Sequence, residues 1–171
     1  MHIMIATDGS LDPGKTVAFL GQLIRPDDRV TVFTVVEVPR SLLSDLRALY
    51  EQRGLLTGPD TDDEYVSATR IATLSPNWPG DDAFIDRYVR DEKELRTEPL
   101  LMALTDAGLN ATAVAIEGAD PTRPILEAVK QENVDLLCAG SHGKGMFEGL
   151  LGSSSTKLVR RAPCPVLLLR I

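Results

Sequence analysis

Short apolar segments alternate with helical patterns along this chain, and that alternation limits the folds open to it. The expected strands are residues 2–7, 29–38, 111–117, 134–139 and 166–170. The expected helices are residues 13–24, 41–53, 82–107, 122–132 and 156–161, with apolar residues spaced along one face. Strands that alternate with helices predict an α/β fold, a doubly wound parallel sheet with right-handed crossovers.

The segment between the second and third strands is too long for a single crossover helix. Residues 82–107 place Phe84, Tyr88, Leu95 and Met102 on one expected face, and Pro99 predicts a kink or a split of this helix. Residues 54–80, rich in Gly, Pro, Thr, Ser and Asp, predict a long loop. We therefore expect one domain over 1–171 with an irregular insertion at about 40–82. The insertion is either a disordered or decorative segment, or a lid or a segment that docks a partner.

Composition excludes several classes of function. The chain has 171 residues, 43% hydrophobic and 25% charged, with a formal net charge of −7. An acidic chain without a basic patch repels nucleic acid, so we expect no nucleic-acid partner. The first residues lack the pattern of a signal peptide, and no apolar run is long enough for a membrane span. Cys138 and Cys164 lie in or beside apolar segments, which predicts two reduced, buried thiols in a cytoplasmic protein.

The glycine-rich stretch from Gly140 to Ser155 is the strongest functional signal. It follows an apolar strand, contains several glycines, and ends in three serines that open a helical pattern. Glycines let backbone N–H groups approach an anion, and a helix N-terminus adds free donors and a positive dipole end. The stretch predicts a site for a nucleotide or another phosphorylated small molecule at the carboxyl edge of the sheet.

A second candidate phosphate loop, Gly9 to Thr16, matches the spacing G-x-x-x-x-G-K-[ST]. Pro13 has no N–H to give a phosphate, and Asp12 would place a carboxylate in the anion cradle. We also find no apolar strand ending in an aspartate that would hold Mg²⁺ opposite this loop. We therefore interpret Asp12 as the N-cap of an ordinary helix.

These motifs together resemble the universal stress protein family, in its nucleotide-binding subgroup. The matching residues are Thr7-Asp8-Gly9-Ser10, Glu117-Gly118 with Asp120-Pro121, Gly140-x-x-Gly143, Gly152-Ser153, Ser155 and Ala162-Pro163-Cys164-Pro165-Val166. The resemblance covers roughly 1–38 and 110–171. One departure is that eight residues, not nine, separate Gly143 from Gly152. The family implies an open, Rossmann-like five-stranded sheet of order 3-2-1-4-5, similar to the adenine nucleotide alpha hydrolases.

The resemblance also implies a ligand and its contacts. The ligand would be ATP or another adenine nucleotide, with Mg²⁺ or Mn²⁺ held through its phosphates. Asp8 would accept a hydrogen bond from the adenine amino group, and the backbone near Val35 and Val36 would flank the base. The residues expected to hold ribose and phosphates are Gly140, Gly143, Gly152, Ser153 and Ser154. We add Lys144 as a cation near the phosphates, and we expect no direct protein ligand to the metal.

The family further implies a homodimer. The last strand, Val166 to Arg170, would be a sheet edge that pairs antiparallel with its copy, which removes an aggregation-prone edge. The expected function is that of an ATP-binding stress-response regulator without fast turnover. The alternatives are a slow ATPase with His142 as the candidate base, a ligand-free dimeric scaffold that binds a partner through its insertion, and a cyclic AMP binder.

Overall fold

The computed structural model describes residues 1–39, 41, 44, 48, 81–141 and 152–170 of the chain. The chain divides into two compact units. The first contains Met1–Glu37 and Val89–Ile171, and the second contains Val38–Tyr88. The strands that the structure describes and the candidate site below belong to the first unit.

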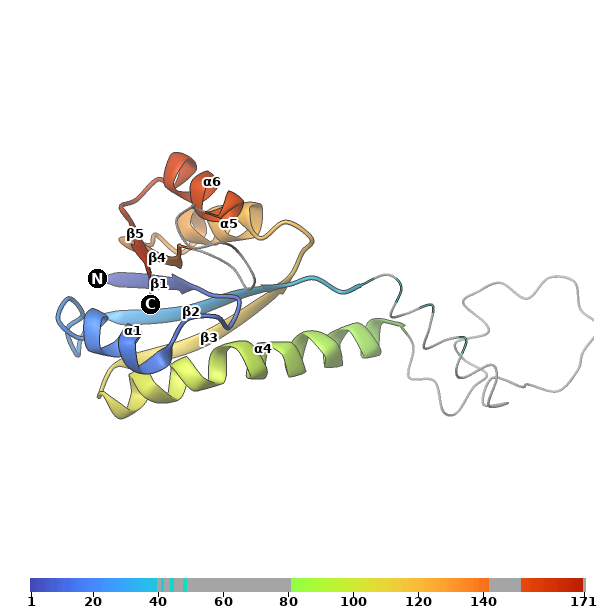
Figure 1. Cartoon of the computed structure of the whole chain (residues 1–171), viewed down its shortest axis with the longest axis horizontal. Coiled ribbons are helices and arrows are strands. Elements are labelled where there is room, and N and C mark those ends of the chain that lie inside the picture. Colours follow the sequence, from blue (N-terminus) through green and yellow to red (C-terminus); the bar gives the residue numbers. More distant parts are fainter. Residues whose placement is uncertain (40, 42–43, 45–47, 49–80, 142–151, 171) are drawn as a thin grey trace, which may run out of the picture. The chain divides into compact units, whose positions relative to one another are not determined.

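A five-stranded parallel sheet forms the centre of the first unit (Figure 1). Its strands are β1 (His2–Ala6), β2 (Arg29–Val36), β3 (Asn110–Glu117), β4 (Leu136–Gly140) and β5 (Val166–Leu169). They lie in the order β3-β2-β1-β4-β5, which confirms the predicted fold class and strand order. The central strand is β1, in which Ile3 pairs with Val30 on one side and with Leu136 on the other.

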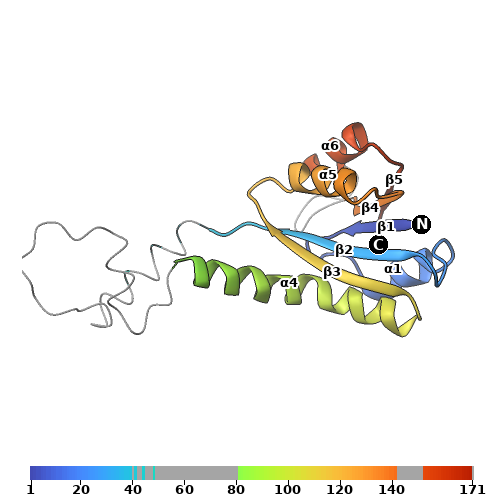
Figure 2. The ribbon, with the colours of Figure 1, turned by 180° about the vertical axis from the view of Figure 1, so that it is seen from behind.

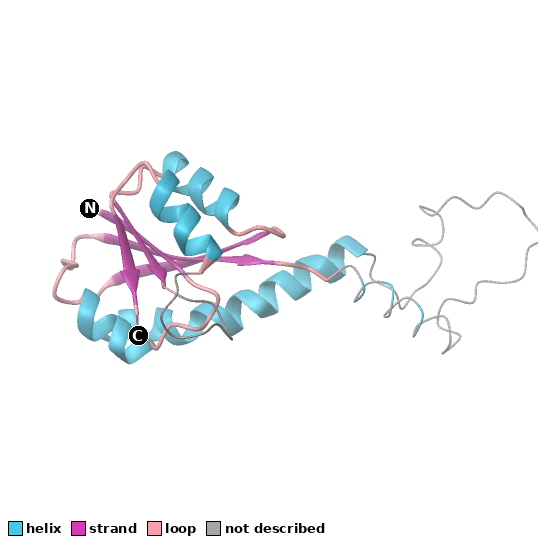
Figure 3. Cartoon of the chain, turned by 45° about the horizontal axis from the view of Figure 1, so that its top comes forward, coloured by secondary structure: helices cyan, strands magenta, loops and turns pink. Residues whose placement is uncertain are grey.

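Helices cover both faces of the sheet. They are α1 (Pro13–Leu20), α4 (Asp81–Asp106), α5 (Thr122–Gln131) and α6 (Ser153–Arg161). Figures 1 and 2 show α1 and α4 on one face and α5 and α6 on the other, and Figure 3 shows how strands and helices alternate through connecting loops. A parallel sheet buried on both faces explains the β-branched, continuously apolar strands of this sequence.

Two apolar cores lie on the two faces. On the side of α1 and α4, Ile3, Ile5 and Val32 pack with Leu20 and Leu104. On the side of α5 and α6, the buried cluster contains Met4, Phe33, Ile125, Val129, Leu137 and Leu158. Alternate residues of β1 thus point to opposite faces, as the period of two along a strand requires.

Three helix predictions were wrong in detail. Helix α1 ends at Leu20 and not at residue 24, because Gly21 caps it. Helix α6 begins at Ser153 and not at Thr156, with Gly152 as N-cap; serine is unfavourable inside a helix but well suited to its first turn. The expected apolar face of α4 was also misplaced. Leu95 and Met102 are 69% and 57% exposed, whereas Thr97, Leu100 and Leu104 are buried against the sheet.

The second unit is described mainly by the start of α4. There the rings of Phe84 and Tyr88 stack, with centroids 6.5 Å apart. The helix expected over 41–53 and the loop expected over 54–80 lie almost entirely outside the described residues.

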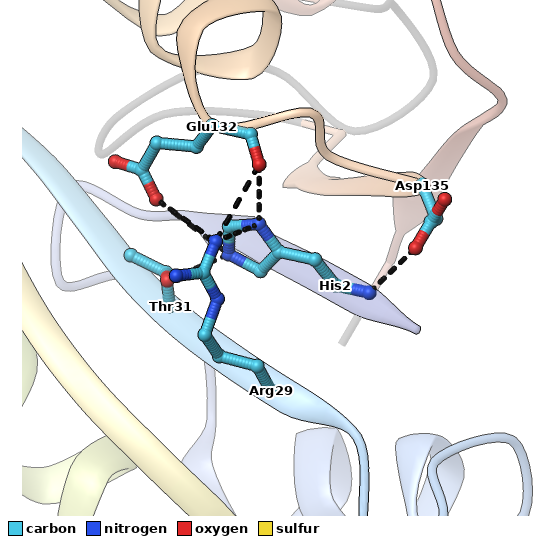
Figure 4. Close-up of polar contacts among 5 residues, drawn as sticks. All are labelled: His2, Arg29, Thr31, Glu132 and Asp135. Atoms are coloured by element: carbon cyan, nitrogen blue, oxygen red, sulfur yellow. Dashed lines mark hydrogen bonds and ion pairs between the residues drawn. The ribbon is translucent and has the colours of Figure 1, made fainter.

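A polar cluster lies at the amino edge of the sheet, with His2 and Thr31 buried and Arg29 exposed (Figure 4). Nη2 of Arg29 lies 2.7 Å from Nδ1 of His2. The backbone oxygen of Glu132 lies 3.2 Å from the same Nδ1, and Oγ1 of Thr31 lies 2.9 Å from Nε2. The backbone N–H of His2 donates to the carboxylate of Asp135 at 2.7 Å. The cluster ties β1 to β2 and to the start of β4, at the edge opposite the candidate site.

Candidate functional site

A cavity of about 360 Å³ lies at the carboxyl edge of the sheet. Its walls come from the segments that follow β1, β2, β3 and β4, and from α4, α5 and α6. In open α/β sheets this edge is where ligands bind, because loops and helix N-termini converge there. The cavity is therefore the candidate site.

The end of β1 places Asp8 in the cavity wall. Gly9 adopts a left-handed backbone with φ of 85°, and its N–H donates to Oγ1 of Thr7 at 3.0 Å. The N–H of Ser10 donates to Oδ1 of Asp8 at 3.0 Å. These two bonds form a tight turn that orients the carboxyl group of Asp8 at the site.

The end of β2 contributes Val35 and Glu37, and α4 contributes Arg96. Nη1 of Arg96 donates to the backbone oxygen of Val35 at 3.1 Å. Nε and Nη2 of the same side chain both lie 2.7 Å from Oε2 of Glu92, one turn earlier on α4. A cation that the sequence did not single out is thus fixed in the wall.

The junction between β4 and α6 contributes Gly140 and the first turn of α6. The hydroxyl of Ser155 donates to the backbone oxygen of Gly140 at 2.7 Å, and the N–H of Gly152 donates to the oxygen of Ser141 at 3.0 Å. The N-cap Gly152 supplies no side-chain cap. The first N–H groups of α6, at Ser153 and Ser154, are therefore suited to an anion.

The connection from β3 to α5 closes the cavity with Gly118, Ala119 and Pro121. A Cβ on Gly118 would lie 3.2 Å from Cγ1 of Val35, so glycine allows the two strand ends to approach closely. Beside it, Asp120 accepts a bond from the N–H of Thr122 at 3.0 Å. That bond, together with Lys157 at 3.2 Å, lowers the pKa of Asp120 to about 2. The carboxylate is charged at neutral pH and pairs with Lys157 of α6 at the surface.

The loop that resembles a P-loop is an ordinary capped helix start. Oδ1 of Asp12 accepts from the N–H of Lys15 at 2.8 Å. The hydroxyl of Thr16 is buried and donates to the backbone oxygen of Asp12 at 2.6 Å. The groups that would bind phosphate and magnesium in a P-loop are used by the helix itself, which confirms the N-cap interpretation.

The structure brings most of the sequence-predicted site residues together. Those in the cavity wall are Asp8, Val35, Gly140, Gly152, Ser153 and Ser154. Val36 is not in the wall, because its side chain is fully buried on the other side of β2. Gly143, Lys144 and His142 lie outside the described residues.

Sequence reasoning missed the cavity residues Glu37, Arg96 and Phe33. Glu37 follows β2 directly, so its position at the carboxyl edge could have been predicted from the sequence. Arg96 had no such signal, because it lies in the middle of a long helix after the insertion.

Within the described ranges, no group of three or more His, Cys, Asp or Glu side chains is arranged to hold a metal ion. In the same part of the chain, no helix is both long and apolar enough to cross a membrane. Cys138 and Cys164 are free thiols. Cys138 is buried as predicted, whereas Cys164 is only half-buried.

Comparison with known proteins decides the family. The model of the universal stress protein family matches residues 1–170. The chain belongs to the universal stress protein family. A universal stress protein of Thermus aquaticus is 37% identical over 99 residues, which are 56% of this chain and 69% of that protein.

Solved structures of the family share the fold. The structure of the hypothetical protein MJ0577 has a TM-score of 0.63 at 17% identity, over 99% of this chain and 95% of that one. A family member from Arabidopsis thaliana, whose structure has AMP bound, has a TM-score of 0.55 at 18% identity, over 99% and 90% of the two chains. At these identities the likeness shows a common fold, with the sheet order found here.

Proposed function

We propose that this universal stress protein binds an adenine nucleotide, ATP in the first place, in the cavity at the carboxyl edge of its sheet. The observation that carries the proposal is the meeting of Asp8 with Gly140, Gly152 and the uncapped first turn of α6 around one cavity. The AMP bound to the Arabidopsis family member supports the choice of an adenine nucleotide.

The residues present fit such a ligand. A volume of about 360 Å³ lies within the range of about 300–1,000 Å³ that is usual for small-molecule sites. The N–H groups of Ser153 and Ser154 would bind phosphate, and the Asp8 carboxylate would accept from the adenine amino group. Gly143 and Lys144 would complete the phosphate end. Mg²⁺ or Mn²⁺ would be held by the phosphates of the ligand.

A regulator without fast turnover fits this donor set best. It contains donors for phosphate, but among the described cavity residues no histidine that could activate water. We further propose that the protein works in the cytoplasm as a homodimer joined through β5, whose Val166, Leu167 and Leu168 are only half-buried at the sheet edge. Sedimentation equilibrium at micromolar concentration should give the dimer mass, and a monomer would contradict this part.

Titration calorimetry with ATP, ADP, AMP and cyclic AMP tests the ligand. Losing a hydrogen bond to a charged group costs roughly 1.5–3 kcal/mol, so Asp8→Ala should weaken ATP binding about 10- to 100-fold. Gly152→Val should weaken it as well, because a side chain there narrows the cavity. Asp27→Ala, an exposed carboxylate outside the cavity wall, is the matched control and should bind as the wild type does.

The outcomes separate the alternatives. A wild type that binds none of the four nucleotides contradicts the proposal and favours a ligand-free scaffold. Preferential binding of cyclic AMP would replace ATP by that ligand at the same site. Steady-state hydrolysis of ATP that His142→Ala abolishes would favour the slow ATPase.

A further inference from the structure

The guanidinium of Arg96 is held rigidly in the wall of the cavity. Oε2 of Glu92 accepts from Nε and pairs with Nη2, both at 2.7 Å, and the Val35 oxygen accepts from Nη1 at 3.1 Å. The Arg96 side chain is 22% exposed and that of Glu92 is 23% exposed. Contacts at all three nitrogens fix both the position and the plane of the group.

These contacts leave donors for a ligand. A guanidinium has five N–H groups, and the contacts to Glu92 and Val35 use three of them. One N–H on Nη1 and one on Nη2 remain, on a side chain that lines the cavity. A charged, planar donor fixed in advance loses little conformational entropy when it binds an acceptor.

Arg96 lies at the end of the cavity where β1 and β2 finish. It binds the last-but-one residue of β2, and its Cα would lie 3.2 Å from a Cβ on Gly9, the neighbour of Asp8. The phosphate donors proposed above belong to α6, which covers the opposite face of the sheet from α4 (Figures 1 and 2). Arg96 therefore lies on the Asp8 side of the cavity.

We infer that Arg96 recognises the base of the bound nucleotide by donating to an acceptor atom of the purine ring. The inference rests on the proposed nucleotide-binding function and names a residue that determines its specificity. A purine carries ring nitrogens that accept, and adenine adds an amino group that donates. Asp8 can only accept when ionised, so it matches the amino group, whereas the ring nitrogens need a donor such as Arg96.

Glu92 acts through Arg96 and is a positioning residue. Its carboxylate holds two of the three guanidinium nitrogens, one helical turn away on α4. Without that charge the guanidinium can rotate, and its free N–H groups no longer point in a fixed direction. The pair places base recognition on a helix that follows the insertion, far along the chain from the glycine-rich segment.

Calorimetric titration of the full-length protein with AMP and with ribose 5-phosphate tests the role. The two probes share the sugar and the phosphate and differ in the base. Arg96→Ala should weaken the binding of AMP about 10- to 100-fold, which is the effect of losing one charged hydrogen bond. The affinity for ribose 5-phosphate should stay within about twofold of the wild-type value. Glu92→Gln should weaken the binding of AMP less than Arg96→Ala does, and it should likewise leave the binding of ribose 5-phosphate unchanged. Arg90→Ala, an exposed arginine on the same helix, is the control and should change neither affinity.

Arg96→Lys is the control for the case in which Arg96→Ala fails to fold. It keeps the positive charge and one donor for the Val35 oxygen, and it should still lose affinity for AMP but not for ribose 5-phosphate, because an ammonium lacks the planar fork. Equal losses for both probes, or unchanged AMP binding in Arg96→Ala, would overturn the inference while the proposed function stands. A wild type that binds neither probe would overturn both.

Discussion

The hydroxyl of Ser155 donates to the backbone oxygen of Gly140 at 2.7 Å, across a separation of 15 residues. The donor lies in the first turn of α6 and the acceptor is the last residue of β4. Together with the bond from Gly152 N–H to the Ser141 oxygen, it fixes the N-terminus of the helix to the end of the strand. These two bonds hold together the two ends of the glycine-rich stretch.

Ser155→Ala should loosen this junction. The variant leaves the Gly140 oxygen without its partner beside a buried position, and an unpaired buried polar group costs about 1–3 kcal/mol. We expect a loss of that size in urea unfolding and weaker nucleotide binding through the displaced α6 N-terminus. Ser153→Ala, an exposed serine of the same turn, is the stability control and should lie within about 0.5 kcal/mol of the wild type. Equal stability of the two variants would show that the bond is unimportant.

Gly9 connects the turn at Asp8 with α4. Its φ is 85°, and an added Cβ would lie 3.2 Å from Cα of Arg96. In Gly9→Ala the alanine backbone is strained, and its Cβ lies too close to the backbone of Arg96, which cannot move aside easily. We therefore expect the free energy of unfolding, measured by heat or urea, to fall by about 1–3 kcal/mol. Gly14→Ala is the matched control, because Gly14 is helical and the new Cβ would meet only Oδ1 of Asp12 at 3.5 Å. That control should gain roughly 0.5–1 kcal/mol, and a similar loss in both variants would contradict the role of Gly9.

The fold could be predicted because its signals are local. Each strand of this sheet is a short, nearly continuous apolar run, and each is followed by a helix, a pattern typical of a buried parallel sheet. Asp8, Gly140 and Gly152 were found for the same reason, since each lies directly next to a strand end or a helix start.

The rest of the site depends on tertiary packing. Arg96 reaches the cavity only because Leu100 and Leu104, not Leu95 and Met102, form the buried face of α4. The pattern of apolar residues along the helix does not distinguish these faces, because the polar Thr97 lies on the buried one. Its hydroxyl donates to the backbone oxygen of Lys93 at 2.7 Å. A hydroxyl satisfied within its own helix can replace an apolar side chain in a core, and a sequence pattern does not reveal this.

Asp120 predicts a dependence of stability on acid pH. Hydrogen bonds from Thr122 and the nearby Lys157 lower its folded-state pKa from 3.8 to about 2. The folded state therefore binds fewer protons than the unfolded state between these values. The stabilisation is complete above pH 3.8 and is lost as the pH falls toward 2. Asp120→Asn should unfold at lower urea than the wild type at pH 7, and the difference should shrink on acidification through this range. Asp106→Asn, an exposed carboxylate at the end of α4, should change the midpoint less. An undiminished difference in urea midpoint between Asp120→Asn and the wild type at pH 2 would contradict the role of the Asp120 carboxylate.

The two thiols should differ in reactivity. Burial raises the pKa of the Cys138 thiol to about 12, so only about one molecule in 10,000 carries the thiolate at pH 8. Burial also raises the pKa of Cys164, but this side chain is half-buried and accessible to reagent. A thiol reagent at pH 8 should modify Cys164 first in the native protein and Cys138 only on unfolding. Mass spectrometry of the peptides identifies the labelled residue. A Cys164→Ser variant should then show no fast labelling, and rapid native labelling of Cys138 would contradict its burial.

Pro99 lies inside α4, which continues from Asp81 to Asp106, so of the predicted kink or split the split does not occur. Proline has no N–H for the carbonyl of Leu95, and in a helix interior it costs about 3 kcal/mol relative to alanine. Because proline also restricts the unfolded chain by about 0.4–1 kcal/mol, Pro99→Ala should raise the free energy of unfolding by about 1–3 kcal/mol. Circular dichroism during urea unfolding measures the gain, with Glu98→Ala, the exposed neighbour, as a control within about 0.5 kcal/mol of the wild type. A less stable Pro99→Ala would contradict this expectation and would show that proline is needed here for Leu100 and Leu104 to pack on the sheet.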